Sequence, residues 1–210
     1  MAVAEEYHRG HDFTKHLGSC CYDAAFRRQL VVYLGGDPSL IKGDWTWAEF
    51  GEQYPELIEP AFELFRTAQE GDPAYGIYAL ACWCGLDLKR ALDALQKVEV
   101  GNPAWEIFLL ALDGMLGAEM ALSAIRKVKV GDPAWAIYLL ARYYGLDVER
   151  ALEAIRQIGV GDPAGAIYRL VLFCGLDVDR AIEALGEMPR GEKYIGWLLL
   201  EVDPREVGND

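Results

Sequence analysis

Side chains able to bind a metal ion are concentrated near the N-terminus. His8, His11 and His16 are followed closely by Cys20 and Cys21. Imidazole nitrogen and thiolate sulfur are ligands that zinc favours in proteins. The spacing matches no standard structural zinc motif, however, and adjacent cysteines are poorly placed to share one tetrahedral site. We therefore predict no metal cofactor, and we keep this segment as the candidate centre of an alternative, metal-dependent enzyme or switch.

Catalytic motifs are missing from the sequence. It contains no Gly-x-Ser-x-Gly elbow, phosphate-binding loop, His-Glu-x-x-His pair or dinucleotide fingerprint. The carboxylates of Glu149, Glu153 and Glu183 are expected on the solvated side of amphipathic helices, which does not favour a paired acid and base. Cys82 and Cys84 would point about 200° apart on a helix, so they are poorly placed to chelate one ion. We predict that the protein is not an enzyme.

The triplet Gly-Asp-Pro could also belong to a phosphate or metal site. Besides the turn at residues 35–38, it begins at residues 71, 131 and 161, and the variant Gly-Asn-Pro begins at residue 101. The units 71–100, 101–130, 131–160 and 161–190 align over their whole length without a gap. A fixed period of this size is typical of a solenoid built from stacked supersecondary units.

Each unit has the pattern of a helical hairpin. In the unit that begins at residue 131, Asp132 is an expected N-cap, Pro133 takes the first helical position, and an apolar run ends at Gly145. A second cap, Asp147, precedes apolar residues at helical steps of three and four. The aspartate of the triplet is therefore interpreted as a helix start signal, not as a functional residue. Gly117 replaces the second cap in the unit 101–130.

The repeat extends beyond the four clear units. Residues 43–70 form a divergent fifth unit, and GEKYIGWLLLEVDP begins a further first helix that would cap the last apolar face. We predict an all-α solenoid of about five helix-turn-helix repeats over residues 43–203, with a C-terminal capping helix. Residues 1–42 form a non-repeating helical N-terminal segment, with a helix in YDAAFRRQLVVYL, and residues 204–210 a flexible tail.

These hairpins resemble tetratricopeptide repeats. Ile137, Leu140, Ala141 and Tyr144 are similar to the large, Leu, Gly/Ala, Tyr core of that family's first helix. The small residue early in its second helix is matched by Ala91, Ala121, Ala151 and Ala181. The family uses 34 residues per repeat and this chain 30, and the resemblance covers about residues 43–203. It implies a right-handed superhelix whose first helices line a concave groove that grips an extended peptide or a partner helix.

The first helices have two distinct sides. Counted from the first glycine of each unit, positions 7, 10, 11 and 14 are nearly invariant and form the expected packing side. Positions 5, 8, 9 and 12 form another side, and all but the aromatic position 8 vary between units. The predicted partner-binding residues on this side are Tyr75, Tyr78, Trp105, Phe108, Trp135, Tyr138, Arg142, Tyr168 and Arg169. Position 8 fits the core equally well, and Arg142 and Arg169 are expected to bind a carboxylate.

Composition narrows the class of partner. A formal net charge of -13 and a pI near 4.7 disfavour extensive direct binding to nucleic acid or to anionic membranes. The chain has no apolar run of membrane-spanning length, no signal-peptide layout and an odd set of five cysteines, so we expect a cytoplasmic protein. Its few Asn and Gln residues favour a thermophilic source.

The sequence thus predicts a non-catalytic adaptor for a protein partner. A basic partner fits the charge, for instance a ribosomal or nucleic-acid-associated protein. The first alternative is a homo-oligomeric assembly factor, with a homodimer as the simplest case. Met120, which stands where three other units have arginine, could mark a contact with another subunit or simple drift of the repeat.

Overall fold

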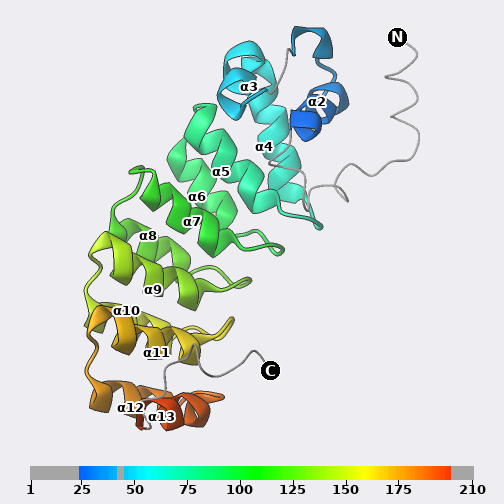
Figure 1. Ribbon diagram of the computed structural model, residues 1–210. Helices are drawn as coiled ribbons and strands as arrows, with labels where there is room; N and C mark the ends of the chain where they lie inside the picture. The colour runs from blue at the N-terminus through cyan, green and yellow to red at the C-terminus, as the bar shows by residue number, and fades with distance from the viewer. Residues whose placement is uncertain (1–23, 42–44, 200–210) are drawn as a thin grey trace.

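The computed structural model describes residues 24–41 and 45–199, and every regular element within them is a helix (Figure 1). The helices follow one another as a stack of hairpins, which confirms the predicted all-α fold with a helical repeat arrangement. The first helices are α3 (Trp47–Gln53), α5 (Pro73–Trp83), α7 (Pro103–Leu112), α9 (Pro133–Tyr144), α11 (Pro163–Cys174) and α13 (Gly191–Leu199). The second helices are α4 (Ile58–Thr67), α6 (Leu88–Leu95), α8 (Ala118–Ile125), α10 (Val148–Arg156) and α12 (Val178–Gly186). Within the described ranges, no helix has the length and apolar character needed to cross a bilayer.

The N-terminal part shares the core of the repeats. Helix α2 (Ala24–Tyr33) and the short 3-10 turn η2 (Pro38–Leu40) precede the divergent unit, in which a second 3-10 turn, η3 (Pro55–Leu57), joins α3 to α4. Phe26 and Leu30 of α2 are buried in the same hydrophobic cluster as the repeat helices. The candidate metal ligands of the alternative reading, His8, His11, His16 and Cys20, lie outside the described residues.

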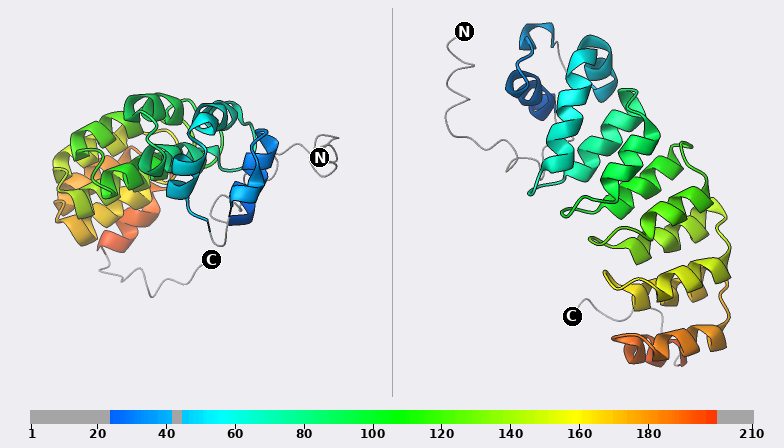
Figure 2. Two further views of the ribbon diagram at one scale, coloured as in Figure 1. Left: turned by 90° about the horizontal axis from the view of Figure 1, so that it is seen from above. Right: turned by 180° about the vertical axis from the view of Figure 1, so that it is seen from behind.

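The hairpins form two layers, and neighbouring helices pack more closely in one layer than in the other. The first helices α3, α5, α7, α9, α11 and α13 contact one another in sequence, and each second helix from α4 onward also packs against the first helix of the next unit. Neighbouring second helices contact one another less than neighbouring first helices do. The first-helix layer is therefore the inner side of the arc that the stack follows (Figure 2).

Invariant apolar positions hold the first-helix layer together. The position 7 isoleucines and position 10 leucines are completely buried in all four units: Ile77, Ile107, Ile137, Ile167, Leu80, Leu110, Leu140 and Leu170. Burial of each such side chain stabilises the fold by about 1.5 to 3 kcal/mol relative to exposure. The predicted packing side is thus confirmed at these two positions.

The second caps also form as predicted. Asp147 accepts a hydrogen bond from the backbone nitrogen of Arg150 at 3.0 Å, and the equivalent bonds link Asp87 to Arg90 and Asp177 to Arg180. Gly117 provides no side-chain cap to α8. The first helix α9 ends at Gly145 in the left-handed conformation, with φ 66°.

The Gly-Asp-Pro triplet does more than start a helix, because it also joins consecutive units. The Asp132 side chain caps α9 by accepting from the backbone nitrogen of Trp135 at 3.1 Å. The backbone nitrogen of Asp132 in turn donates to Oδ1 of Asn102 in the preceding unit, at 3.2 Å. The equivalent contact, from the nitrogen of Asp162 to Oδ1 of Asp132, is 3.5 Å long. Cap residues of successive units are therefore joined by hydrogen bonds, and we call this series the ladder.

The glycine of the triplet makes room for this ladder. Gly131 has φ 73°, and a Cβ atom added there would lie 2.5 Å from Oδ1 of Asn102. Only glycine combines that backbone conformation with so close an approach. At the C-terminal end, the Tyr194 hydroxyl of α13 donates to Oδ2 of Asp162 at 2.7 Å, which closes the ladder.

A second ladder of ion pairs runs along the second helices. Arginines at position 20 pair with glutamates that lie 31 residues earlier: Arg90 with Glu59, Arg150 with Glu119 and Arg180 with Glu149. Met120 takes the arginine position in the remaining unit, and the residue 31 positions earlier is Lys89 instead of an acid. An arginine at position 120 would therefore approach a like charge. This gives a local electrostatic reason for the pattern break that needs no second subunit.

Candidate functional site

Large apolar side chains are exposed in a row at the C-terminal ends of the first helices. Their exposed fractions run from 41% to 66%. They occupy positions 12 and 13 of consecutive units, and we call them the apolar stripe: Trp83, Leu112, Tyr143, Leu172 and Phe173. Large apolar side chains that several neighbouring units leave exposed are candidates for an interaction site.

Buried aromatic side chains pack against two residues of the apolar stripe. Trp83 lies edge-on to Tyr78, with ring centroids 5.2 Å apart. Phe173 lies against Tyr138 of the preceding unit, at 6.5 Å. These contacts limit the rotamers of the stripe side chains, which lowers the entropy that a partner must overcome on binding.

Five of the nine predicted partner-binding residues have their rings in the core. They are Tyr75, Tyr78, Phe108, Tyr138 and Tyr168, all less than a tenth exposed. Position 8 is covered because neighbouring first helices pack directly against one another in the inner layer. The prediction that these rings form a partner surface is corrected accordingly: the four rings at position 8 belong to the core, and Tyr75, at position 5, is buried as well.

The other four predicted residues keep accessible surface. Trp105, Trp135 and Arg169 are half-buried, and Arg142 is exposed. The Arg169 guanidinium lies 4.7 Å from the centroid of the Trp135 ring and donates through Nη1 to the carbonyl of Gly165 at 3.1 Å. This stacking fixes the guanidinium and leaves its other donors available.

Arg142 is fixed in a similar way at the end of α9. Its Nη1 donates to the carbonyl of Phe173 at 2.6 Å, and its guanidinium lies 5.6 Å from the Phe173 ring centroid. Neither Arg142 nor Arg169 forms an ion pair with a carboxylate in the described part of the chain. Both guanidinium groups therefore keep donors that no described carboxylate engages.

The tyrosine hydroxyls below the stripe differ between units. Tyr78 donates to Oδ2 of Asp113, which occupies position 13 of the next unit, at 2.7 Å. Burial, reinforced by Asp113, raises the pKa of Tyr78 far above its usual range. Burial likewise raises the pKa of Tyr138, whereas the positive charges of Arg142 and Arg169 oppose that shift.

The described cysteines are not arranged for catalysis or metal binding. Burial raises the pKa of Cys82 and of Cys84 to about 12, so both remain thiols at neutral pH. Cys82 lies 3.5 Å from Oδ2 of Asp113 in the next unit, whereas Cys84 donates to the carbonyl of Trp47 in the preceding unit. Within the described ranges no three His, Cys, Asp or Glu residues cluster as a metal site requires.

One carboxyl group is buried at a junction between units. Glu106 of α7 is 2% exposed, and its Oε2 has no hydrogen-bond partner among the described residues. Burial, and secondly the charge of Asp72, raises the pKa of Glu106 to about 8. The same position holds Gly76, Ala136 and Ala166 in the other units, so a repeat alignment could have singled this residue out.

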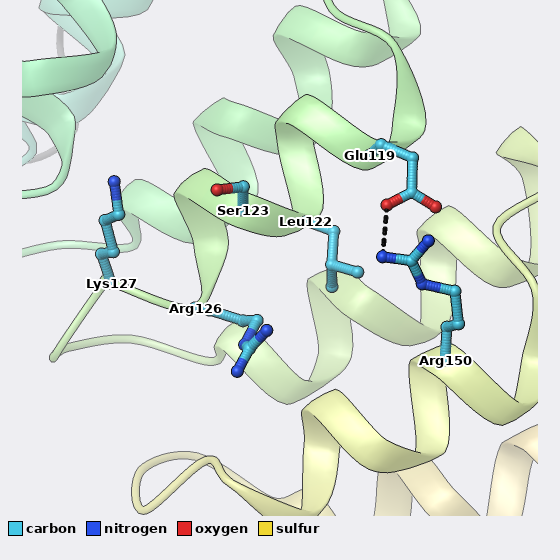
Figure 3. Close-up of a pocket in the computed structure, with 6 residues that line it drawn as sticks. All are labelled: Glu119, Leu122, Ser123, Arg126, Lys127 and Arg150. Atoms are coloured by element: carbon cyan, nitrogen blue, oxygen red, sulfur yellow. Dashed lines mark ion pairs between the residues drawn. The ribbon is translucent and has the colours of Figure 1, made fainter.

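The outer side of the stack carries a shallow hollow between α8 and α10 (Figure 3). It measures about 440 Å³ and is lined by Glu119, Leu122, Ser123, Arg126, Lys127 and Arg150. Arg150 is paired with Glu119 at 2.8 Å, and Arg126 donates to Gln157. Its charged lining groups are exposed and two of its three cations are already engaged, so the hollow has no preorganised centre for chemistry.

Sequence reasoning missed position 13, the outermost part of the stripe. The signal was present, because position 13 is aromatic in three of the four units, as Trp83, Tyr143 and Phe173. No protein-family model, curated protein or solved structure matches this chain.

Proposed function

We propose that this protein is a non-catalytic adaptor, similar in design to tetratricopeptide-repeat proteins, that binds a protein partner along the apolar stripe. The observation that carries the proposal is the exposure of large apolar side chains at position 12 or 13 of consecutive units. A plain structural solenoid gains nothing from leaving these side chains in water, since burying each would contribute about 1.5 to 3 kcal/mol.

The composition of the stripe and its surroundings favours a protein as the ligand. Tyr, Trp and Arg residues are enriched at the energetic centres of protein interfaces. Trp105, Trp135, Arg142 and Arg169 lie on the same first helices as the stripe and extend this surface. The stripe runs over several units, which suits an extended segment or a helix better than a small molecule.

The charge of the chain favours a partner that is basic as a whole. The net charge of -13 attracts a basic protein at long range, for instance a ribosomal or nucleic-acid-associated protein, and repels bare nucleic acid. The glutamates of the ion-pair ladder are on the second helices. Long-range attraction and apolar contact would thus use different sides of the hairpins.

Affinity capture with surface variants tests the proposal. The bait is the full-length protein, and the stripe variant is Trp83→Ala with Tyr143→Ala. The matched control is Glu153→Ala with Glu183→Ala, two exposed positions on the second helices. We expect one protein to be retained by the wild type and the control and lost by the stripe variant, with unchanged circular dichroism. Loss by the control but not by the stripe variant would place the site elsewhere.

A further inference from the structure

The tyrosine hydroxyl at position 8 has different surroundings at two equivalent junctions between units. At the first, the Tyr78 hydroxyl donates to the Asp113 carboxylate of the next unit at 2.7 Å. At the other, the counterpart of Tyr78 is Tyr138, and Phe173 stands in the place of Asp113. The Tyr138 ring is buried, but its hydroxyl oxygen reaches solvent. This hydroxyl makes no hydrogen bond to a described residue. A hydroxyl that one junction satisfies with a carboxylate is therefore available at the other.

Two cations lie over the rings that contact Tyr138. The Tyr138 ring lies 5.0 Å from the Trp135 ring and 6.5 Å from the Phe173 ring, measured between centroids. The Arg169 guanidinium lies 4.7 Å from the Trp135 centroid, and that of Arg142 lies 5.6 Å from the Phe173 centroid. Each guanidinium is held by a backbone carbonyl and an aromatic ring, that of Phe173 or Trp135, and neither pairs with a described carboxylate. The position 20 arginines of the second helices, in contrast, are each paired with a glutamate. Two preorganised guanidinium groups, without a carboxylate partner in the described part of the chain, thus lie over rings that contact Tyr138.

We propose that Tyr138, Arg142 and Arg169 bind the side-chain carboxylate of an aspartate or glutamate in the partner, a step that rests on the proposed adaptor function. Charge-assisted hydrogen bonds from guanidinium to carboxylate are among the strongest that proteins form. The pairing of Tyr78 with Asp113 shows, within the same chain, how a side-chain carboxylate fits against the position 8 hydroxyl.

The surroundings define the partner segment further. Tyr143 and Phe173 of the apolar stripe are exposed, and their ring centroids lie 5.9 and 5.6 Å from the Arg142 guanidinium. An acidic residue bound there would carry its sequence neighbours onto this apolar surface. The preferred segment is therefore an acidic residue with apolar or aromatic residues close to it in sequence, even where the partner protein as a whole is basic.

A variant that supplies its own carboxylate tests the site without the partner. Phe173→Asp places a carboxylate opposite Tyr138, as Asp113 is placed opposite Tyr78. Tyr143→Asp is the matched control, because position 8 of its preceding unit is Phe108, which has no hydroxyl. We expect NMR titration to give the carboxyl at residue 173 a pKa below the usual value of about 3.9, and lower than that of the control. In an Arg142→Gln and Arg169→Gln background this pKa should rise towards the usual value. A usual or raised pKa in Phe173→Asp itself would overturn the proposal.

Selection from a random peptide library displayed on phage then tests the partner chemistry. We expect wild-type protein to enrich peptides with an internal Asp or Glu beside apolar residues. Exchange of that acid for Asn or Gln should weaken binding at least 10-fold on wild type and by less than 2-fold on the Arg142→Gln and Arg169→Gln protein. Peptides that need the stripe but no acid would overturn the carboxylate site and leave the adaptor function standing. Binding that requires the free C-terminal carboxylate of the peptide would also contradict the side-chain carboxylate site. Peptides whose binding does not change when stripe residues are substituted would contradict both the carboxylate site and the adaptor function.

Discussion

The side chain of Asn102 accepts a hydrogen bond from the backbone nitrogen of Asp132, thirty residues further along the chain, at 3.2 Å. One cap residue thereby holds the first backbone turn of the next unit. The relationship accounts for the spacing of the Gly-Asp-Pro triplets, because each triplet supplies a helix start and, through its glycine, the space for the preceding cap. The same contact recurs one unit further on, from the backbone nitrogen of Asp162 to Oδ1 of Asp132, at 3.5 Å.

Substitution at Gly131 should disturb this contact. Gly131→Ala adds a Cβ at 2.5 Å from Oδ1 of Asn102 to a residue with φ 73°, whereas Gly145→Ala meets no atom within 4 Å at φ 66°. Both changes carry the strain of a left-handed alanine, about 1 kcal/mol. We expect Gly131→Ala to lower the free energy of unfolding by roughly 1 to 3 kcal/mol more than Gly145→Ala. Urea denaturation measures both, and equal losses would show that the ladder contributes nothing.

Glu106 should make stability depend on pH. Its pKa in the folded protein, about 8, lies above its ordinary value of 4.5, so the folded state holds this proton more tightly than the unfolded state does. The resulting stabilisation is complete below pH 4.5 and is lost as the pH rises to about 8. Glu106→Gln does not titrate, so the stability of wild type relative to this variant should fall between pH 4.5 and 8.5 by roughly a few kcal/mol. Parallel pH profiles of the two proteins would mean that the carboxyl is solvated.

The break in the ion-pair ladder can be repaired with two substitutions. Met120→Arg alone should give no gain in stability, since it brings a cation towards Lys89. Combined with Lys89→Glu, it should restore the pairing seen between Arg150 and Glu119. A double-mutant cycle from thermal unfolding should show a small favourable coupling that disappears in 1 M salt, because screening removes surface ion pairs. An unfavourable or salt-independent coupling would rule out the ladder as the reason for the Met120 exchange.

Truncation of an aromatic side chain should lower stability far more in the core than in the apolar stripe. Phe108→Ala removes a buried ring and should cost about 3 to 5 kcal/mol of stability. Tyr143→Ala removes a side chain that is 66% exposed and should change stability by about 0.5 kcal/mol or less. Calorimetry of the two variants compares them directly. A large loss for Tyr143→Ala would make the stripe part of the fold instead of a surface for binding.

The sequence predicted helices well and depth of burial less well. Caps such as Asp147 and apolar steps such as Ile137 to Leu140 depend on local rules, so the hairpins and their boundaries could be predicted. The burial of Tyr138 depends on how closely the next first helix approaches, which is a property of the stacked layer and not of one unit. Position 13 lies about 140° from position 8 around the helix. It was therefore left off the predicted face, although Tyr143 is the most exposed aromatic residue described on the first helices.

Electrostatic features also required the structure. The pairing of Arg90 with Glu59 joins residues from different units, so the alignment alone did not explain Met120. That Arg142 and Arg169 form no ion pair with a described carboxylate could be established only from the structure. Arg142 and Arg169 were nevertheless predicted as partner-binding residues, because they occupy the variable positions 12 and 9 of the first helices.

Site-specific photocrosslinking tests the central claim most directly. A photoreactive phenylalanine analogue at position 143 reports contacts of the apolar stripe, and the same analogue at position 153 reports contacts of the second helices. We predict that irradiation of the full-length protein bound to its captured partner yields a covalent adduct from position 143 and none from position 153. An adduct from position 153 alone, with position 143 unreactive, would contradict the assignment of the stripe as the binding surface.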